Sequence, residues 1–270
     1  MEKTLLETHR DLNIPGLHRR RVDVWLPETY QTNPDLSFPV LYMQDGQTVF
    51  DNWKRGNGGW EVNRTITRLA EEEKIFPPIV VAISSTLNRA GDYLPAKAID
   101  ANNPPASSAS NTLNGQRQTR ELVSDRYLEW MVTTLKPAID ARYRTLRDAQ
   151  NTALMGSSMG GLISLYAYCE YPEIYGKAAC LSTHWTALGS GMLAYLEAHL
   201  PPPDQHRLYF DYGSEGLDKD YEPWQTKVDA LLRQKGYREG KEFASWHFAG
   251  EDHTTSAWRS RLHIPLTFLF

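Results

Sequence analysis

Residues 151–168 read NTALMGSSMGGLISLYAY: an apolar strand-like run, a serine flanked by glycines, and an apolar helix-like run. The centre, GSSMG at 156–160, is a G-x-S-x-G turn, where the chain passes so sharply from strand into helix that only small residues fit beside the serine. The turn predicts that Ser158 stands above a sheet at a helix N-terminus, where charge on a reacting carbonyl is stabilised. This stretch therefore predicts an α/β fold with a serine nucleophile, and an incidental glycine-rich turn is the alternative.

The composition is that of a soluble globular domain. The chain has 270 residues, of which 41% are hydrophobic and 23% charged, and residues 1–270 are predicted to form a single domain. The net charge of −4 gives no electrostatic reason to expect a nucleic acid or an anionic membrane as partner. No apolar run approaches the roughly 18 residues needed to span a bilayer. The N-terminus lacks the apolar core of a secretion signal, so we expect a cytoplasmic location unless a leader has been removed.

Two cysteines, Cys169 and Cys180, occur in apolar company on a predicted helix and the following predicted strand. We expect two buried free thiols rather than a disulfide, and their spacing is not of the metal-binding type.

Apolar runs alternate with amphipathic runs along the chain. Continuous apolar runs at 39–43 and 78–83 are typical of parallel strands covered on both faces, whereas 19–26 alternates as a half-buried edge strand does. Further strands are predicted at 153–155, 177–181, 207–212 and 242–248, and helices at 60–73, 124–143, 161–168, 221–235 and 256–270. This alternation predicts a mostly parallel central sheet flanked by helices on both faces.

The segment 88–120 breaks the alternation. It contains NNPPASSAS at 102–110 and has little apolar periodicity. A segment of this length inside a compact domain is either a functional lid or a flexible, disordered insertion. A lid is favoured because the segment follows a central strand and so leaves from the sheet's carboxyl edge, where ligands bind.

A serine hydroxyl needs a histidine to accept its proton near neutral pH. In this fold the acid and the histidine follow the serine in that order, on loops after late strands. His253 comes a turn after the last predicted strand and is the expected base. For the acid, Asp218 is favoured over the alternative Glu215, although neither lies at the commonest spacing after Gly213. A carboxylate is required there because it fixes the imidazole tautomer and stabilises the imidazolium.

An oxyanion hole requires two backbone N–H donors. Met159, the residue after the nucleophile, is the first. The second is expected in the turn DGQT at 45–48, which follows the strand at 39–43. By analogy with His-Gly-x turns at this place in other hydrolases, Gln47 is the predicted donor, and a simple turn built on Asp-Gly is the alternative.

Substrate contacts are expected from two segments at the carboxyl edge of the sheet. His184 and Trp185 follow the strand at 177–181, and Arg89 and Tyr93 lie in the predicted lid. These four side chains are the predicted substrate-binding residues, although tryptophans pack in cores at least as often.

Four motifs resemble the esterase D-like, or putative-esterase, family of α/β-hydrolases. They are DGQTVF at 45–50, the run at 127–143, GSSMGG at 156–161, and His253 followed by Trp-Arg at 258–259. The family includes siderophore esterases, feruloyl esterases of carbohydrate esterase family one, S-formylglutathione hydrolases and mycolyltransferases. The Asp-Gly turn at 45–46 stands where S-formylglutathione hydrolases carry His-Gly, which argues against that branch.

The resemblance implies an α/β-hydrolase fold and an esterase in which Ser158 and His253 react while Gln47 and Met159 hold the oxyanion. The expected function is a serine carboxylic-ester hydrolase that forms an acyl-enzyme on Ser158, with no metal or organic cofactor. Its expected substrate is a small-molecule or carbohydrate-linked ester, including a specialised feruloyl- or siderophore-type ester. Acyl transfer to an alcohol and a non-catalytic binding module are the alternatives.

Overall fold

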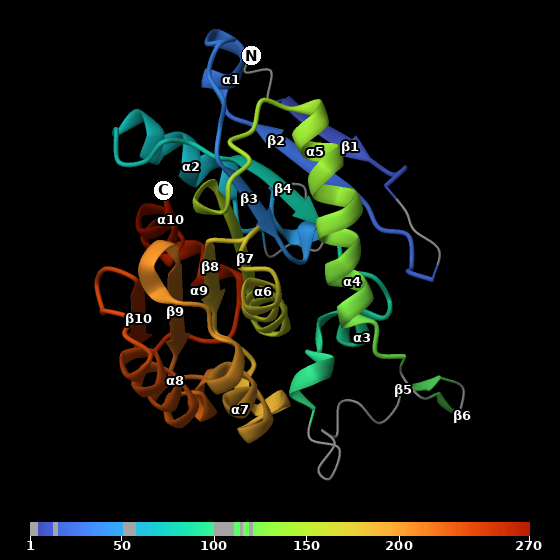
Figure 1. Cartoon of the computed structure of the whole chain (residues 1–270), viewed down its shortest axis with the longest axis vertical. Coiled ribbons are helices and arrows are strands. Elements are labelled where there is room, and N and C mark those ends of the chain that lie inside the picture. The colour runs from blue at the N-terminus through green and yellow to red at the C-terminus, as the bar shows by residue number, and fades with distance from the viewer. Residues whose placement is uncertain (1–4, 13–15, 51–57, 100–110, 114–115, 119–120) are drawn as a thin grey trace.

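An eight-stranded sheet forms the centre of the computed structural model, which describes residues 5–12, 16–50, 58–99, 111–113, 116–118 and 121–270 (Figure 1). The strand order is β1-β2-β4-β3-β7-β8-β9-β10. From β4 to β10 all neighbours run parallel, and β2 and β1 are added antiparallel at one edge. This arrangement confirms the predicted mostly parallel sheet. The strands are β1 Leu5–His9, β2 Val22–Leu26, β3 Val40–Met43, β4 Ile79–Ile83, β7 Thr152–Ser157, β8 Lys177–Leu181, β9 Arg207–Gly213 and β10 Phe243–Phe248.

Helices cover both faces of the sheet, and each face has its own apolar core. One face carries α2 Val62–Glu71, α9 Thr255–Arg261 and α10 His263–Leu269. The other carries α3 Arg89–Tyr93, α4 Ser124–Trp130, α5 Lys136–Arg142, α6 Met159–Glu170, α7 Ser190–His199 and α8 Glu222–Gln234. A short α1, Glu28–Thr32, follows β2. Because β3 and β4 are covered on both sides, they read as continuous apolar runs in the sequence. Within the described residues, no helix has the length and apolarity to cross a bilayer.

The strand predicted at 19–26 is not an edge strand. β2 pairs with β4 on one side and with β1 on the other, and all five of its residues are buried. The alternation in the sequence was misleading because Asp23 is buried too: its carboxylate accepts a hydrogen bond from Thr8 of β1 and pairs with Arg21. The edge position belongs to β1, which the sequence analysis did not predict.

Two predicted helices are interrupted. The run 124–143 is one continuous rod in Figure 1, but a π turn at Met131–Leu135 joins α4 to α5. Pro137, which has no N–H to donate, is the second residue after that turn. The predicted helix 256–270 is two helices that meet at Leu262, and α10 has Pro265 in its first turn.

Part of the predicted lid belongs to the core. Residues 88–99 contain α3 and a short turn at Ala96–Ala98, and Tyr93, Leu94 and Ala98 are buried. β5, Asn111–Leu113, pairs antiparallel with β6, Gln116–Gln118, as a hairpin outside the main sheet (Figure 1). Residues 100–110, 114–115 and 119–120 lie outside the described residues, so the lid remains a prediction there.

Both cysteines are buried free thiols, as predicted. Burial raises the pKa of Cys169 and of Cys180, which keeps both protonated.

Candidate active site

Ser158 occupies the turn between β7 and α6. Its backbone has φ 57° and ψ −125°, a conformation that costs a non-glycine residue about 1–3 kcal/mol. The flanking glycines make the turn possible, because a Cβ on Gly156 would lie 2.5 Å from the backbone of Gly160. Ser158 stays half-buried while Ser157 and Met159 on either side are buried. The strained backbone therefore presents one serine at the surface of an otherwise closed core.

Backbone hydrogen bonds hold Ser158 to the next strand. Its N–H donates to the Leu181 carbonyl at 2.9 Å, and its carbonyl accepts from the His184 N–H at 3.3 Å. Met159 and Gly160 are the first residues of α6, and amides in a first helical turn have no acceptor within the helix. The site beside Ser158 therefore favours a developing negative charge.

The turn after β3 carries Gln47, the second predicted oxyanion donor. Two residues separate that strand from a short 3-10 turn, Gly46–Thr48. Gly46 is pressed against β4, since a Cβ there would lie 2.5 Å from the Ala82 carbonyl carbon. The Gln47 side chain is held by Ser85: its Oε1 accepts the Ser85 N–H at 2.9 Å and its Nε2 donates to the Ser85 hydroxyl at 2.7 Å. The predicted oxyanion donor of Gln47 is its backbone N–H.

Arg89 and Tyr93 of α3 hold this turn in place. Asp45 has a left-handed backbone, and its carboxylate accepts two hydrogen bonds of 2.7 Å from Arg89. The Asp45 N–H donates to the Tyr93 hydroxyl at 3.0 Å. Tyr93 is completely buried, so the predicted contact between Tyr93 and substrate is wrong. Arg89 is half-buried, and its guanidinium stacks 5.2 Å from the Tyr93 ring.

His253 and Asp218 are brought together at the same edge of the sheet. The His253 Nδ1 lies 2.5 Å from the Asp218 Oδ1, and Asp218 is 1% exposed. The other oxygen, Oδ2, accepts from the Gly213 N–H and the Ser182 hydroxyl, each at 2.6 Å. Burial alone would raise the pKa of Asp218, but the hydrogen bonds from His253, Ser182 and Gly213 outweigh burial and lower it. The carboxylate is therefore ionised and can hold His253 in the tautomer that carries its proton on Nδ1.

The alternative acid, Glu215, lies on the surface. Its side chain is exposed and its carboxylate accepts from the neighbouring Ser214 hydroxyl at 3.1 Å. The structure thus pairs His253 with Asp218, the carboxylate favoured from the sequence.

Strand pairing explains why these loops meet. Ser157 pairs with Leu181 across β7 and β8, and Leu181 pairs with Asp211 across β8 and β9. β9 and β10 then end together, with Gly213 opposite Phe248. The loops after these parallel strands therefore emerge at one carboxyl edge, which is where ligands bind in such sheets.

His184 is linked to both the serine and the base. Its N–H donates to the Ser158 carbonyl, and its Nδ1 lies 2.6 Å from the hydroxyl of Tyr221. The Tyr221 ring packs edge-on against His253. Burial lowers the pKa of His184, and the neighbouring His253 and Arg89 lower it further. His184 is therefore a half-buried neutral imidazole at the site, consistent with its predicted place.

Trp185 does not reach the site. It is 2% exposed, its indole N–H donates to the Gln225 Oε1 at 3.1 Å, and its ring packs on Phe210. The predicted substrate contact is wrong because the 3-10 turn that begins at Trp185 points this side chain into the core while His184 stays at the edge.

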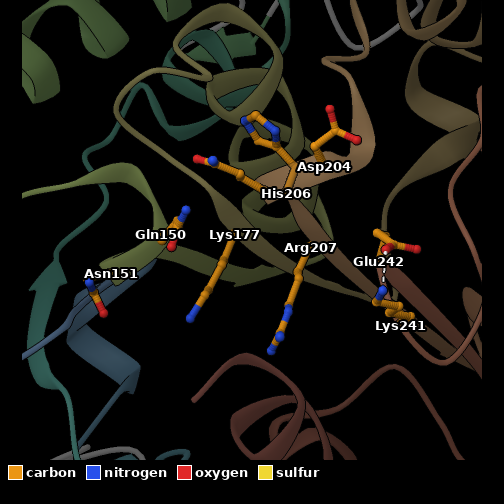
Figure 2. A pocket seen from close by; sticks show the side chains of 9 residues that line it. Gln150, Asn151, Lys177, Asp204, His206, Arg207, Lys241 and Glu242 are labelled. Atoms are coloured by element: carbon orange, nitrogen blue, oxygen red, sulfur yellow. Dashed lines mark ion pairs between the residues drawn. The ribbon is translucent and has the colours of Figure 1, made fainter.

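A charged cavity of about 310 Å³ lies at the opposite edge of the sheet. Lys177 and Arg207, the first residues of β8 and β9, line it and point the same way in Figure 2. Lys177 donates to the Leu269 carbonyl at 2.5 Å and Arg207 to the Phe268 carbonyl at 3.2 Å. These cations stabilise the C-terminal end of α10, and their position at the amino ends of parallel strands separates the cavity from Ser158.

The chain is similar to known esterases in sequence. The profile of the putative esterase family matches residues 17–266. The chain belongs to that family. It is 26% identical over 226 residues to the uncharacterized protein YbbA of Bacillus subtilis, covering 82% of this chain and 80% of that protein. It is 27% identical over 186 residues to the apo-salmochelin esterase of Escherichia coli O6:H1, covering 67% of this chain and 53% of that protein.

Solved structures of esterases share the fold. A ferulic acid esterase superposes with a TM-score of 0.68 at 17% identity, covering 99% of this chain and 97% of that one. The enterobactin esterase of Shigella flexneri, solved in the presence of enterobactin, gives a TM-score of 0.72 at 17% identity, covering 100% of this chain and 59% of that one. The chain thus spans a little over half the length of the apo-salmochelin esterase and of this enterobactin esterase. The fold is that of the α/β-hydrolases, and this member of the putative esterase family is a carboxylic ester hydrolase.

Sequence reasoning missed two supporting groups. It did not predict the pair between Asp45 and Arg89 that braces the turn carrying Gln47. It also gave no role to Ser182, whose buried hydroxyl donates to the Asp218 carboxylate.

Proposed function

We propose that Ser158, His253 and Asp218 are a catalytic triad that hydrolyses carboxylic esters through an acyl-enzyme. The observation that carries the proposal is the 2.5 Å bond between the His253 Nδ1 and a buried, ionised Asp218. The acid and base lie at the sheet edge where the strained Ser158 turn emerges. The strain at Ser158 has no evident structural purpose in the core, and such strain clusters at reacting groups.

Acylation begins with proton transfer. Asp218 keeps the His253 proton on Nδ1, so the Nε2 lone pair is free to accept the proton of the Ser158 hydroxyl. As that proton leaves, the Oγ forms a bond to the ester carbonyl carbon, and the carbonyl π electrons move to oxygen. The N–H groups of Met159 and Gln47 stabilise the oxyanion, and the Asp218 carboxylate stabilises the imidazolium.

Collapse of the tetrahedral intermediate breaks the bond between the acyl carbon and the alcohol oxygen. The leaving alkoxide takes the proton from the His253 Nε2. Water then donates a proton to the same nitrogen and attacks the acyl-enzyme, and a second collapse releases the acid and returns the proton to Ser158. Each proton that enters His253 leaves it again within the same half-reaction.

A hollow beside the oxyanion turn offers a place for part of the substrate. It has a volume of about 490 Å³ and is lined by His18, Arg19, Gln47, Ser85, Thr86 and Leu87. Leu87 is fully exposed at its rim, so the lining combines an apolar side chain with basic and hydroxyl groups. Such a lining suits an aromatic acyl group that carries hydroxyls. The names of the related ferulic acid and enterobactin esterases point to the same class, a feruloyl- or siderophore-type ester.

The nucleophile is tested by replacing Ser158 with alanine. We expect ester hydrolysis to fall by a factor on the order of 10⁴ or more, and labelling by a fluorophosphonate to disappear. Ser157→Ala is the matched control for labelling, because it removes the neighbouring hydroxyl and leaves the Ser158 hydroxyl in place. Unchanged hydrolysis by Ser158→Ala would overturn the proposal.

The substrate class is tested with a panel of p-nitrophenyl esters, methyl ferulate, acetylated xylan and a catecholate trilactone. We expect a preference of about a hundredfold, or 2.7 kcal/mol in barrier, for methyl ferulate or the catecholate trilactone, whose aromatic groups carry hydroxyls, over the p-nitrophenyl esters and acetylated xylan. The same assay with an added alcohol distinguishes hydrolysis from acyl transfer, since transfer product would grow with the alcohol concentration at the expense of the free acid.

A further inference from the structure

We infer that Ser182 is a positioning residue that directs its only hydroxyl proton to Asp218 and so fixes the charge and orientation of that carboxylate; this inference rests on the proposed triad. Ser182 follows β8 directly, is completely buried, and reaches no substrate. It acts through Asp218, on the side of the carboxylate that faces away from His253.

The hydrogen bonds of the Ser182 hydroxyl leave it one arrangement. The Trp258 indole N–H donates to its Oγ at 2.9 Å, and an N–H of the Arg261 guanidinium donates to the same oxygen at 3.2 Å. A serine hydroxyl has two acceptor positions and one proton. Since Trp258 and Arg261 can only donate, they fill the acceptor positions, and the proton is left for the Asp218 Oδ2 at 2.6 Å.

A buried ion pair between Arg261 and Asp211 holds the Arg261 guanidinium in this arrangement. Arg261 also donates to the Asp211 Oδ1 at 2.8 Å, and both side chains are at most 3% exposed. The Asp211 Oδ2 accepts from the Tyr209 hydroxyl at 3.1 Å, and the Asp211 carbonyl accepts from the Ser182 N–H at 2.7 Å. The Arg261 guanidinium lies 4.9 Å from the centre of the Phe248 ring.

The backbone conformation of Ser182 indicates that surrounding contacts hold this residue in position. Its φ is 43°, in the left-handed region that a serine rarely adopts. Such a conformation persists only where the surroundings determine it, and here the N–H and the hydroxyl are both held. The same contacts that hold Ser182 therefore orient its proton.

The expected consequence concerns the charge available to His253. Three donors share the Asp218 carboxylate: His253 on Oδ1, and Ser182 and Gly213 on Oδ2. Without the Ser182 donor, less of the negative charge of the carboxylate is neutralised by hydrogen bonds, and only Gly213 still donates to Oδ2. The protonated form of His253 is then stabilised more strongly, while the carboxylate orients its ring less precisely.

The test compares Ser182→Ala with Ser164→Ala. Ser164 is the matched control because it is equally buried and its hydroxyl donates only to the Gly160 carbonyl within α6. For Ser182→Ala we expect kcat on a p-nitrophenyl ester to fall by about tenfold with KM unchanged. We also expect the midpoint of the ascending limb of kcat/KM against pH to move up by about 0.5. Ser164→Ala should keep the wild-type kcat and midpoint.

The pH readout separates positioning from a purely structural role. Among the residues that the structure describes, the titratable groups around His253 are Asp218, Tyr221, His184 and the adjacent Asp252, and Ser182→Ala leaves all of them in place. A wild-type kcat and midpoint in Ser182→Ala overturns the inference, and so does a lower kcat with an unmoved midpoint.

Ser182→Gly serves where the alanine variant does not fold, because glycine adopts a φ of 43° without strain. The same kcat and midpoint changes are expected, and their absence overturns the inference equally. Failure of the proposed triad gives a different result. In that case Ser158→Ala would hydrolyse esters as fast as the wild type, whatever the Ser182 variants do.

Discussion

Replacing Asp218 with asparagine should inactivate the enzyme through the tautomer of His253. The asparagine amide has one acceptor oxygen and one NH₂ group, and the structure decides which way they face. The Oδ2 position meets two donors at 2.6 Å, the Gly213 N–H and the Ser182 hydroxyl, so an NH₂ group cannot occupy it. The NH₂ must therefore face the His253 Nδ1, which then has to accept a hydrogen bond.

An imidazole that accepts at Nδ1 carries its proton on Nε2 and cannot take the proton of Ser158. The loss expected from this wrong tautomer is about 10⁴-fold in kcat, or about 5.4 kcal/mol in barrier. The fold should survive, because the side chain keeps its volume and its two hydrogen bonds to Gly213 and Ser182.

The assay is steady-state hydrolysis of a p-nitrophenyl ester, with thermal unfolding to verify the fold. Glu215→Gln is the matched control, since it makes the same chemical change at the exposed alternative carboxylate and should leave kcat unchanged. The reasoning is refuted by an Asp218→Asn enzyme within tenfold of the wild type, or by a Glu215→Gln enzyme as inactive as Asp218→Asn is expected to be.

Two further predictions concern the oxyanion turn and the far edge of the sheet. Arg89→Met removes both hydrogen bonds to Asp45, so the turn that carries Gln47 should loosen and kcat should fall on the order of tenfold. The surface variant Arg68→Met should keep the wild-type kcat. Equal kcat values in the two variants would contradict the bracing role of Arg89. Burial lowers the pKa of Lys177 to about 8, whereas its pKa in the unfolded chain is about 10.4. Between these two pH values the unfolded chain binds more protons than the folded protein, so the unfolding free energy of the wild type should rise with pH. Lys177→Met should remove that gain, measured as the difference in unfolding free energy between the two proteins across this range; a constant difference would exclude it.

Much of the fold could be predicted from local patterns. The runs at 39–43 and 78–83 gave β3 and β4, because parallel strands buried on both faces must be continuously apolar. The helix predicted at 221–235 ends where Gly236 takes a left-handed backbone. The edge of the sheet could not be predicted this way, since the alternation at 19–26 comes from a buried Asp23 whose partners, Thr8 and Arg21, give no periodic signal.

The candidate site, too, could be predicted only where the signal is local in the sequence. The nucleophile and the base follow from local sequence, since Ser158 needs the flanking glycines and His253 needs only to follow the last strand. Two of the four predicted substrate-binding side chains did not follow, because Trp185 and Tyr93 are buried. Which way a loop side chain faces depends on contacts from distant segments, and one sequence does not encode those contacts locally.

The sequence by itself determined that strands alternate with helices and that a serine stands in a strained turn between one strand and one helix. Periodicity and the small size of glycine are local properties, so they can be read along the chain. Only the tertiary structure decided that Asp218 rather than Glu215 contacts His253, and that Ser182, Trp258 and Arg261 surround that carboxylate. The physical reason is that a buried charge requires several donors at hydrogen-bond distance, and only the folded sheet brings donors from separate strands and helices to one carboxylate.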